Sequence, residues 1–183
     1  MQNNIIWEGL NDESIENCNV LTNADGFKAE SIVSLSTEEY ICNIEYALSI
    51  NQKWESQFCR IKNCLEEGDK CLELQRLPGN KWLINGDEDH RFNGFDGIDI
   101  AVTPFTNTLI INRRQLQEEE SINMRIIYIE PIEMVCQPIE VLYTKLTSKE
   151  YEYHNLTTGY HVVLDVNEAG FVTYYPGFFK MLQ

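Results

Sequence analysis

The sequence predicts a mainly β fold in a single domain, and three observations support this. Hydrophobic and polar residues alternate with a period of two along several segments. Turn-forming residues recur about every 8–12 positions, a spacing typical of a sandwich, roll or barrel. No long segment shows the 3.6-residue period of an amphipathic helix. At roughly 100–200 residues per domain, the 183 residues predict one domain over positions 1–183.

The clearest predicted strand begins at Tyr40. Its even positions, up to Ile50, are mostly apolar, while most odd positions are small or polar, so one face is expected to be buried. Leu72 and Leu74 alternate with polar neighbours in the same way. We interpret 36–39 as a turn and 115–121 as a charged loop or hairpin tip. The other segments that the pattern predicts as strands are 55–62, 81–84, 108–112, 124–130, 139–144, 151–154, 160–166 and 171–175.

The strong negative charge excludes some classes of partner. The chain has 14 Lys and Arg against 29 Asp and Glu, a formal net charge of −15. Such a chain repels phosphate backbones and anionic membrane surfaces, so we expect no nucleic-acid partner. The first residues lack the basic and apolar regions of a secretory signal, and no run approaches the ~18 apolar residues of a membrane span. We therefore expect a cytoplasmic protein without stable membrane insertion.

The residues that usually bind metals or cofactors do not form a known pattern. The six cysteines lack zinc-ligand spacing, and without an export signal we expect them to be reduced and to pack as small hydrophobic residues. The acidic run that begins at Asp87 has Phe92 where a calcium loop needs glycine, so we interpret it as a solvated loop. Phosphate-binding glycine loops and nucleophile motifs are also missing from the sequence. We expect no metal and no cofactor, and we assign no catalytic residue.

The segment from Gly94 to Leu109 contains the most informative residues. Asp99 is flanked by Ile98 and Ile100, which we expect on the opposite face of a strand. Polar side chains follow it at Thr106, Asn107 and Thr108, and two arginines come soon after at Arg113 and Arg114. Two interpretations remain open. Asp99 either accepts hydrogen bonds in a buried structural network, or it anchors a polar group at the mouth of an apolar cavity.

This segment resembles the signature of a family described as putative glycolipid-binding. The family carries an aspartate followed by T-P-F-T-N-T-L-P-I-R-R-L, and residues 99–113 here match most of it. Other landmarks appear in the same order along nearly the whole chain: Trp7, Trp54, Gly79 with Trp82, Tyr151 and Tyr153, Asp165, and Tyr175 to Phe178. Two positions depart from the signature. Ile110 replaces the family's proline and Asn112 replaces the first arginine of its pair, while Arg113 matches the second.

The resemblance implies an antiparallel β-roll or half-barrel with little helix and a lipid-like or glycolipid ligand. On this basis the predicted ligand-binding residues are Asp99, Thr103, Thr106, Asn107, Thr108, Arg113 and Tyr175. If the arginine pair binds an anionic group, the departure at Asn112 removes half of that charge. Arg114 could replace it only after a shift in strand register, because neighbouring residues of a strand face opposite sides.

Three functions from different classes follow from these observations. The first, which we favour, is a module that binds a lipid or another amphipathic small molecule in a curved sheet. The second is an enzyme in which Asp99 or Asp165 is a general acid or base and Arg113 stabilises an oxyanion. The third is a structural or protein-interaction domain. Residues 103–114 contain no acid and two arginines, so the net charge does not exclude an anionic ligand head group.

Overall fold

The computed structural model describes residues 2–11, 13–37, 41–65 and 68–183. Strands form most of these residues, joined by one α-helix and one short 3₁₀ helix, η1. In chain order the elements are β1 (Gln2–Gly9), β2 (Glu13–Asn23), β3 (Gly26–Ser36), β4 (Ile41–Asn51), β5 (Ser56–Cys64), β6 (Lys70–Leu77), β7 (Lys81–Ile84), β8 (Asp87–Glu88), η1 (His90–Phe92), β9 (Gly97–Ile100), α1 (Phe105–Arg114), β10 (Ser121–Glu130), β11 (Val135–Lys145), β12 (Glu150–Asn155), β13 (His161–Val166), β14 (Val172–Tyr175) and β15 (Phe179–Met181).

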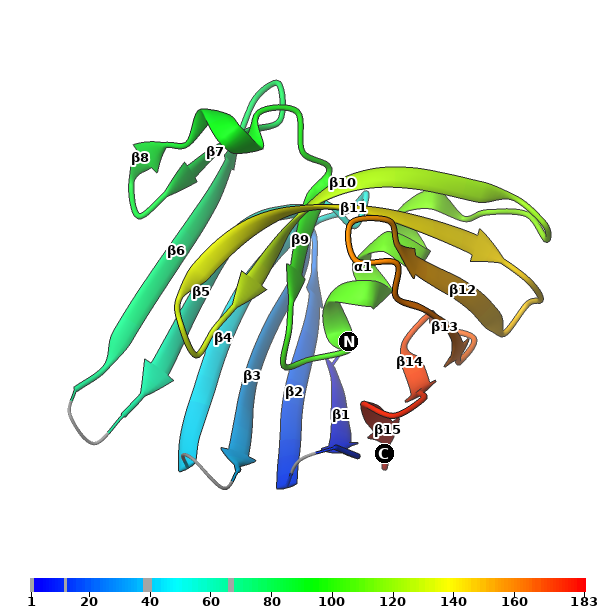
Figure 1. Cartoon of the computed structure of the whole chain (residues 1–183), viewed down its shortest axis with the longest axis horizontal. Coiled ribbons are helices and arrows are strands. Elements are labelled where there is room, and N and C mark those ends of the chain that lie inside the picture. Colours follow the sequence, from blue (N-terminus) through cyan, green and yellow to red (C-terminus); the bar gives the residue numbers. More distant parts are fainter. Residues whose placement is uncertain (1, 12, 38–40, 66–67) are drawn as a thin grey trace.

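The described strands belong to one sheet with the order β8-β7-β6-β5-β4-β3-β2-β1-β15-β14-β13-β12-β11-β10-β9. Neighbouring strands are antiparallel except for β9, which pairs with β10 in parallel. The first and last strands of the chain, β1 and β15, pair at the centre of the sheet. In Figure 1, β1 to β6 form a broad curved surface, and β10 and β11 arch across its upper end. The fold is therefore a single mainly β domain, as the sequence predicted.

Helix α1 connects the two halves of the hydrophobic core. Phe105 and Leu109 pack with buried residues of β1 to β7, whereas Ile110 and Ile111 pack with buried residues of β10 to β14. Every residue from Phe105 to Ile111 is buried, including the polar residues Thr106, Asn107 and Thr108, so this part of the helix has no solvent-exposed face. A helix segment that is buried on all sides is typical of an interior position. The helix therefore lies between the two parts of the rolled sheet.

The prediction of a strand at 108–112 was wrong, because these residues belong to α1. A short apolar run cannot be assigned to helix or strand by periodicity when every side is buried. The isoleucines at 110 and 111 favour a strand by local preference, and burial against both halves of the sheet overrides that preference. Ile110 lies inside the helix, where its backbone N–H is available for the helical hydrogen bonds that a proline cannot donate.

Most other predicted strands correspond to observed ones within one to four residues at each end. The strand predicted from Tyr40 is β4, and position 40 and the acidic residues 38 and 39 of the predicted turn lie outside the described residues. Asp87 and Glu88 were predicted to be in a loop, but they form the short exposed strand β8. Residues 115–120 form the predicted loop before β10.

The cysteines and the N-terminal tryptophan have clear structural roles. All six cysteines are free, and Cys18, Cys42 and Cys59 are buried in the core. The indole of Trp7 is 1% exposed, and its N–H donates to the carbonyl oxygen of Val172 over 2.7 Å. This bond joins β1 to β14 and reinforces the junction between the two halves of the sheet.

Candidate functional site

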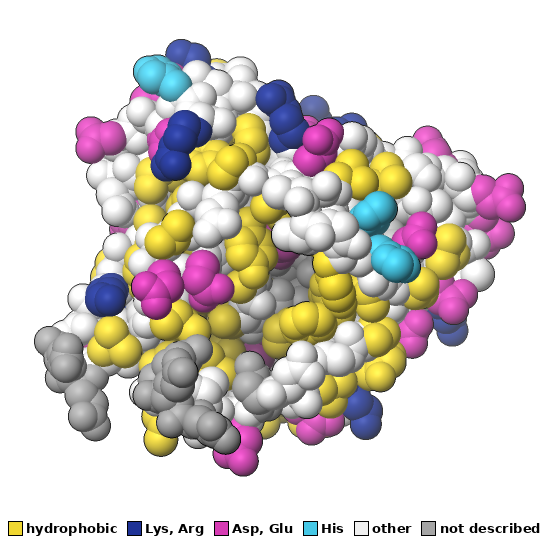
Figure 2. Space-filling model, in the orientation of Figure 1, with side chains coloured by type: hydrophobic (Ala, Val, Ile, Leu, Met, Phe, Trp, Pro, Cys, Tyr) yellow, Lys and Arg dark blue, Asp and Glu magenta, His cyan; other side chains and the backbone are white. Residues whose placement is uncertain are grey.

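A pocket of about 280 Å³ opens inside the roll, between the β9–β12 part of the sheet and the C-terminal strands. Figure 2 shows that this face of the molecule is hollowed near its middle and that hydrophobic side chains border the hollow. The described lining residues come from β9 to β12, α1, β14 and β15, and from the turns that follow β9, β12 and β14. They are Asp99, Ile100, Ala101, Thr103, Asn107, Tyr128, Gln137, Ile139, Tyr153, Asn155, Thr158, Tyr160, Tyr175, Phe178 and Phe179.

Asp99 supplies the carboxyl group of this pocket. Its neighbours Ile98 and Ile100 are buried in the core, as the strand pattern predicted, and Asp99 points away from them. The Thr106 hydroxyl donates to Asp99 Oδ1 over 2.6 Å and accepts from the Ile100 backbone N–H over 3.2 Å. Burial raises the pKa of Asp99 to about 6, against the smaller lowering effect of the Thr106 hydrogen bond. Oδ2 has no hydrogen-bond partner among the described residues.

Asn107 lies on the first turn of α1, and its amide is held in one orientation. The Tyr143 hydroxyl donates to Asn107 Oδ1 over 2.6 Å. The other end of the amide, Nδ2, has two N–H donors and no hydrogen-bond partner within the described part of the chain. Because Asn107 lines the pocket, this NH₂ group is a donor that a ligand can use.

Thr103 connects the pocket to a second buried carboxyl group, Glu16 on β2. Glu16 is 2% exposed, and its Oε1 accepts hydrogen bonds from Tyr46 at 2.6 Å, Ser31 at 2.8 Å and Thr103 at 2.9 Å. Burial raises the pKa of Glu16 to about 7, although these three hydrogen bonds act to lower it. Thr103 also accepts from the backbone N–H of Phe105 over 3.0 Å, which stabilises the start of α1.

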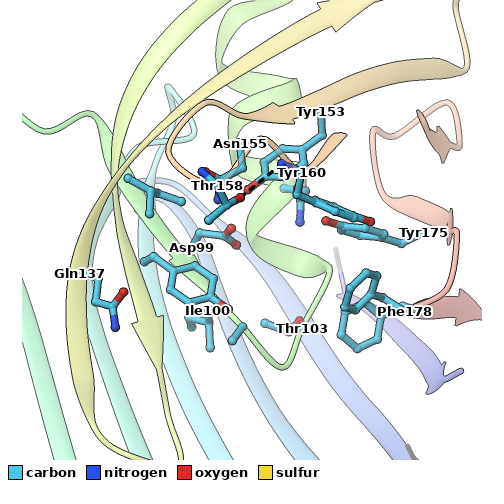
Figure 3. A pocket seen from close by; sticks show the side chains of 15 residues that line it. Asp99, Ile100, Thr103, Gln137, Tyr153, Asn155, Thr158, Tyr160, Tyr175 and Phe178 are labelled. Carbon is cyan, nitrogen blue, oxygen red and sulfur yellow. Dashed lines mark hydrogen bonds between the residues drawn. The ribbon is translucent and has the colours of Figure 1, made fainter. Parts of the chain in front are cut away.

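Aromatic side chains form one wall of the pocket. Figure 3 shows Tyr153, Tyr160, Tyr175 and Phe178 on one side of the space, with Asp99 directed towards it and Gln137 on the opposite side. Tyr175 contacts Phe178 with ring centroids 5.1 Å apart, and Phe178 contacts Tyr160 at 5.8 Å. Phe178 is 40% exposed and Tyr160 is 37% exposed, so these two rings lie at the mouth.

The structure separates the predicted site residues into two groups. Asp99, Thr103, Asn107 and Tyr175 line the pocket, and Thr106 is bonded to Asp99. Thr108 and Arg113 are not among the described lining residues. Thr108 is fully buried, and its hydroxyl has no partner in the described part of the chain.

Arg113 is directed towards β5 and away from the pocket. Its guanidinium lies 3.0 Å from Glu55 Oε1 and donates to the backbone carbonyl of Asp96. Its side chain is 12% exposed, and Arg114 lies 3.8 Å from Asp96. The arginines therefore connect the end of α1 to the residue before β5 and to the segment before β9, and neither arginine is among the described lining residues of the pocket.

The departure at Asn112 also lies outside the pocket. Its amide N–H donates to the Ala169 carbonyl over 2.9 Å. The same amide group occupies the space that a Cβ atom at position 170 would need. A side chain at position 170 would place Cβ 2.6 Å from Asn112 Oδ1. Asn112 therefore fixes the turn between β13 and β14.

Sequence reasoning missed most of the aromatic wall, including Tyr128, Tyr153, Tyr160 and Phe178. Tyr153 and Phe178 were noted as family landmarks, but their role depends on strand pairing that one sequence does not contain. Glu16 was also missed, although a signal exists: it occupies the same face of β2 as buried Cys18 and Val20. The period of two thus places this acid on the buried face.

Among the described residues no group of three or more His, Cys, Asp or Glu is arranged to hold a metal ion. The helices within the same residues are too short or too polar to cross a membrane.

Comparison with known proteins identifies the family. The family described as putative glycolipid-binding matches residues 4–181 of the chain. The chain belongs to this family. Its structure is also similar to the crystal structure of a DUF1089 family protein from Pseudomonas aeruginosa, with a TM-score of 0.82, 29% identity and 91% of each chain covered. No curated protein matches the chain.

Proposed function

We propose that this protein binds a lipid, glycolipid or other amphipathic small molecule, with the polar end of the ligand in the pocket. The observation that carries the proposal is the combination of the Asp99 carboxyl with an aromatic wall in one partly enclosed space. Small-molecule sites are typically concave, mostly apolar and equipped with a few fixed polar groups. The family description supports the same role.

The size of the pocket favours partial enclosure of the ligand. Its volume of about 280 Å³ lies near the lower limit of roughly 300–1,000 Å³ for small-molecule sites. The pocket can take a polar head group, while the apolar tail would extend past Phe178 and Tyr160 at the mouth. Asp99, Asn107, Thr103 and Tyr175 are the proposed contacts, and Thr106 orients Asp99.

Two substitutions of matched exposure test this proposal. Phe178 is 40% exposed and lines the pocket, whereas Tyr174 is 39% exposed and is not among the described lining residues. The delipidated protein should melt at a higher temperature in the presence of decyl glucoside, because a ligand that binds only the folded state stabilises it. Phe178→Ala should reduce that increase strongly, and Tyr174→Ala should not.

Two results would contradict the proposal. One is an unchanged melting temperature at all glucoside concentrations below micelle formation. The other is an equal reduction of the ligand effect by both substitutions, which would indicate binding to an exposed apolar surface outside the pocket.

The alternative of an enzyme loses its structural support. It required Arg113 to stabilise an oxyanion beside Asp99, and Arg113 is instead paired with Glu55. Asp165 is also not among the described lining residues.

A further inference from the structure

The charge of the pocket is set by one carboxyl group. Among its described lining residues Asp99 is the acid, and none is Lys or Arg. The tyrosines in the wall are neutral near pH 7, because burial raises the pKa of Tyr153 and Tyr175 above the ordinary value. An anionic group in this space would therefore meet a like charge without a counter-charge.

The free hydrogen-bonding groups of the pocket are of both kinds. Asp99 Oδ2 is a free acceptor, because Thr106 binds Oδ1. Asn107 Nδ2 is a free donor, because Tyr143 binds the amide oxygen. The Gln137 amide adds one donor group and one acceptor from the opposite side.

A hydroxyl group matches this arrangement because it can donate to Asp99 and accept from Asn107. A phosphate or carboxylate head has acceptors only and would be repelled by Asp99. A protonated amine has donors only, so the Asn107 NH₂ would lose its hydration without gaining an acceptor. The rings of Tyr153, Tyr175 and Phe178 offer apolar faces to a flat or cyclic group.

We propose that the pocket selects an uncharged, hydroxyl-bearing head group, such as a sugar ring, and rejects anionic heads of the same size. This inference rests on the proposed function, since it specifies the chemistry of the ligand that the same pocket takes.

The test uses three detergents with the same decyl tail, each below its micelle concentration, in calorimetric titrations at pH 8. They are decyl glucoside, decyl phosphate and decylammonium, the protonated form of decylamine. The delipidated protein should bind the glucoside at least about tenfold more tightly than the phosphate, because like charges in a partly enclosed site repel strongly. It should also prefer the glucoside to the ammonium compound.

Asp99→Asn tests the origin of this selectivity. The substitution removes the charge and keeps an oxygen acceptor for Thr106, so the preference for glucoside over phosphate should fall by about tenfold or more. Asp165→Asn is the matched control, because it removes a half-buried acid from β13 that is not among the described lining residues. It should leave the preference unchanged.

Asn107→Asp provides a second variant that does not depend on Asp99. It keeps an acceptor for Tyr143 and replaces the free donor by an acceptor, so glucoside binding should weaken while binding of the ammonium compound strengthens. Circular dichroism and the melting temperature establish that each variant is folded.

The outcomes separate this inference from the proposed function. If decyl phosphate or decylammonium binds as tightly as the glucoside, and Phe178→Ala abolishes that binding, the pocket binds amphiphiles but the head-group inference is wrong. If none of the three detergents binds, the proposed function fails and the inference fails with it. An unchanged preference in a folded Asp99→Asn protein would also overturn the inference.

Discussion

At the scale of single residues, the half-buried carboxyl group of Asp99 and the buried carboxyl group of Glu16 differ in how fully they are bonded. Asp99 has one oxygen bonded to Thr106 and one directed to the pocket, which is the arrangement expected of a group that contacts a ligand. Glu16 concentrates three hydroxyl donors on Oε1, while Oε2 is buried and has no partner among the described residues. An ionised carboxylate in that position is costly, because burial removes its hydration.

Glu16 should therefore make stability depend on pH. Its pKa in the folded protein is raised to about 7 from an ordinary value near 4.5. A raised pKa means that the folded state binds the proton more tightly, so its stabilising contribution is complete below pH 4.5 and is lost as the pH rises through 7. Relative to Glu16→Gln, the wild-type protein should lose about 3 kcal/mol of unfolding free energy across this range.

Urea denaturation of both proteins at several pH values measures this difference. Glu13→Gln is the control on the same strand, because Glu13 is exposed. Parallel stability curves for the wild type and Glu16→Gln between pH 4.5 and 8 would show that Glu16 does not titrate as described.

Arg113 should contribute to stability and not to ligand binding. Arg113→Met would leave Glu55 and the Asp96 carbonyl without this partner, at a cost of about 2 kcal/mol for a partly buried pair. Arg114→Met is the matched control: its side chain is 38% exposed, and we expect a loss below about 1 kcal/mol.

The affinity of Arg113→Met for decyl glucoside, measured by calorimetry, should equal that of the wild type. A folded Arg113→Met protein with strongly reduced affinity would restore Arg113 as a ligand contact and contradict the position described for its side chain.

At the scale of elements, the sequence predicted strands well and the helix poorly. In β4 apolar and polar residues alternate clearly along the sequence, because one face of the strand is buried and the other is more exposed. In α1 no such contrast exists, since residues 105–111 are buried on all sides. Whether such a fully buried segment forms a helix or a strand depends on which strands surround it. Those strand pairings, such as β1 with β15, are long-range contacts that the local sequence pattern does not encode.

The same limit applies to the site. Asp99, Thr103 and Asn107 of the signature block line the pocket, because these residues lie close together around the start of α1. Arg113 was grouped with them because it belongs to the same signature block, but nearly two further turns of helix carry it to the other end of α1, where it pairs with Glu55 just before β5. The remaining wall comes from strands far away in the chain.

The turn between β13 and β14 should be sensitive to a side chain at position 170. Gly170 and Gly159 have nearly equal positive φ values of +77° and +78°, but only at Gly170 would Cβ meet another described atom within 4 Å. Gly159→Ala should therefore cost about 1–2 kcal/mol for the left-handed conformation alone, and Gly170→Ala should cost more because it displaces Asn112.

Chemical denaturation of the two variants and of a Gly170→Ala, Asn112→Ala double variant tests this account. Removal of the Asn112 amide should recover the excess cost at Gly170. Equal losses at Gly170 and Gly159 would mean that the contact with Asn112 has no energetic weight.

At the scale of the whole molecule, a continuous sheet is rolled so that helix α1 and the pocket around Asp99 lie inside it. The first and last strands pair with each other, and the Trp7 indole bonds across this junction to Val172. The C-terminal strands β14 and β15 and the turn between them also supply Tyr175, Phe178 and Phe179 to the pocket. Closure of the fold and formation of the aromatic wall therefore depend on the same strands.

The net charge of −15 can now be compared with the local charge of the pocket. The described ion pairs lie mostly on the outside of the molecule, while the pocket contains one acid and no described basic residue. The overall charge and the local charge of the pocket thus have the same sign. Both disfavour an anionic head group, which the two arginines of the signature block had left open.

The most direct test of the account is the map of backbone amide chemical-shift changes when decyl glucoside is added to the isotope-labelled, delipidated protein. We expect saturable changes concentrated at 99–107, 128, 137–139, 153–160 and 175–179. Changes confined to the outer face of β2 to β5, or spread over exposed apolar residues such as Ile15 and Ile41, would contradict binding in the pocket.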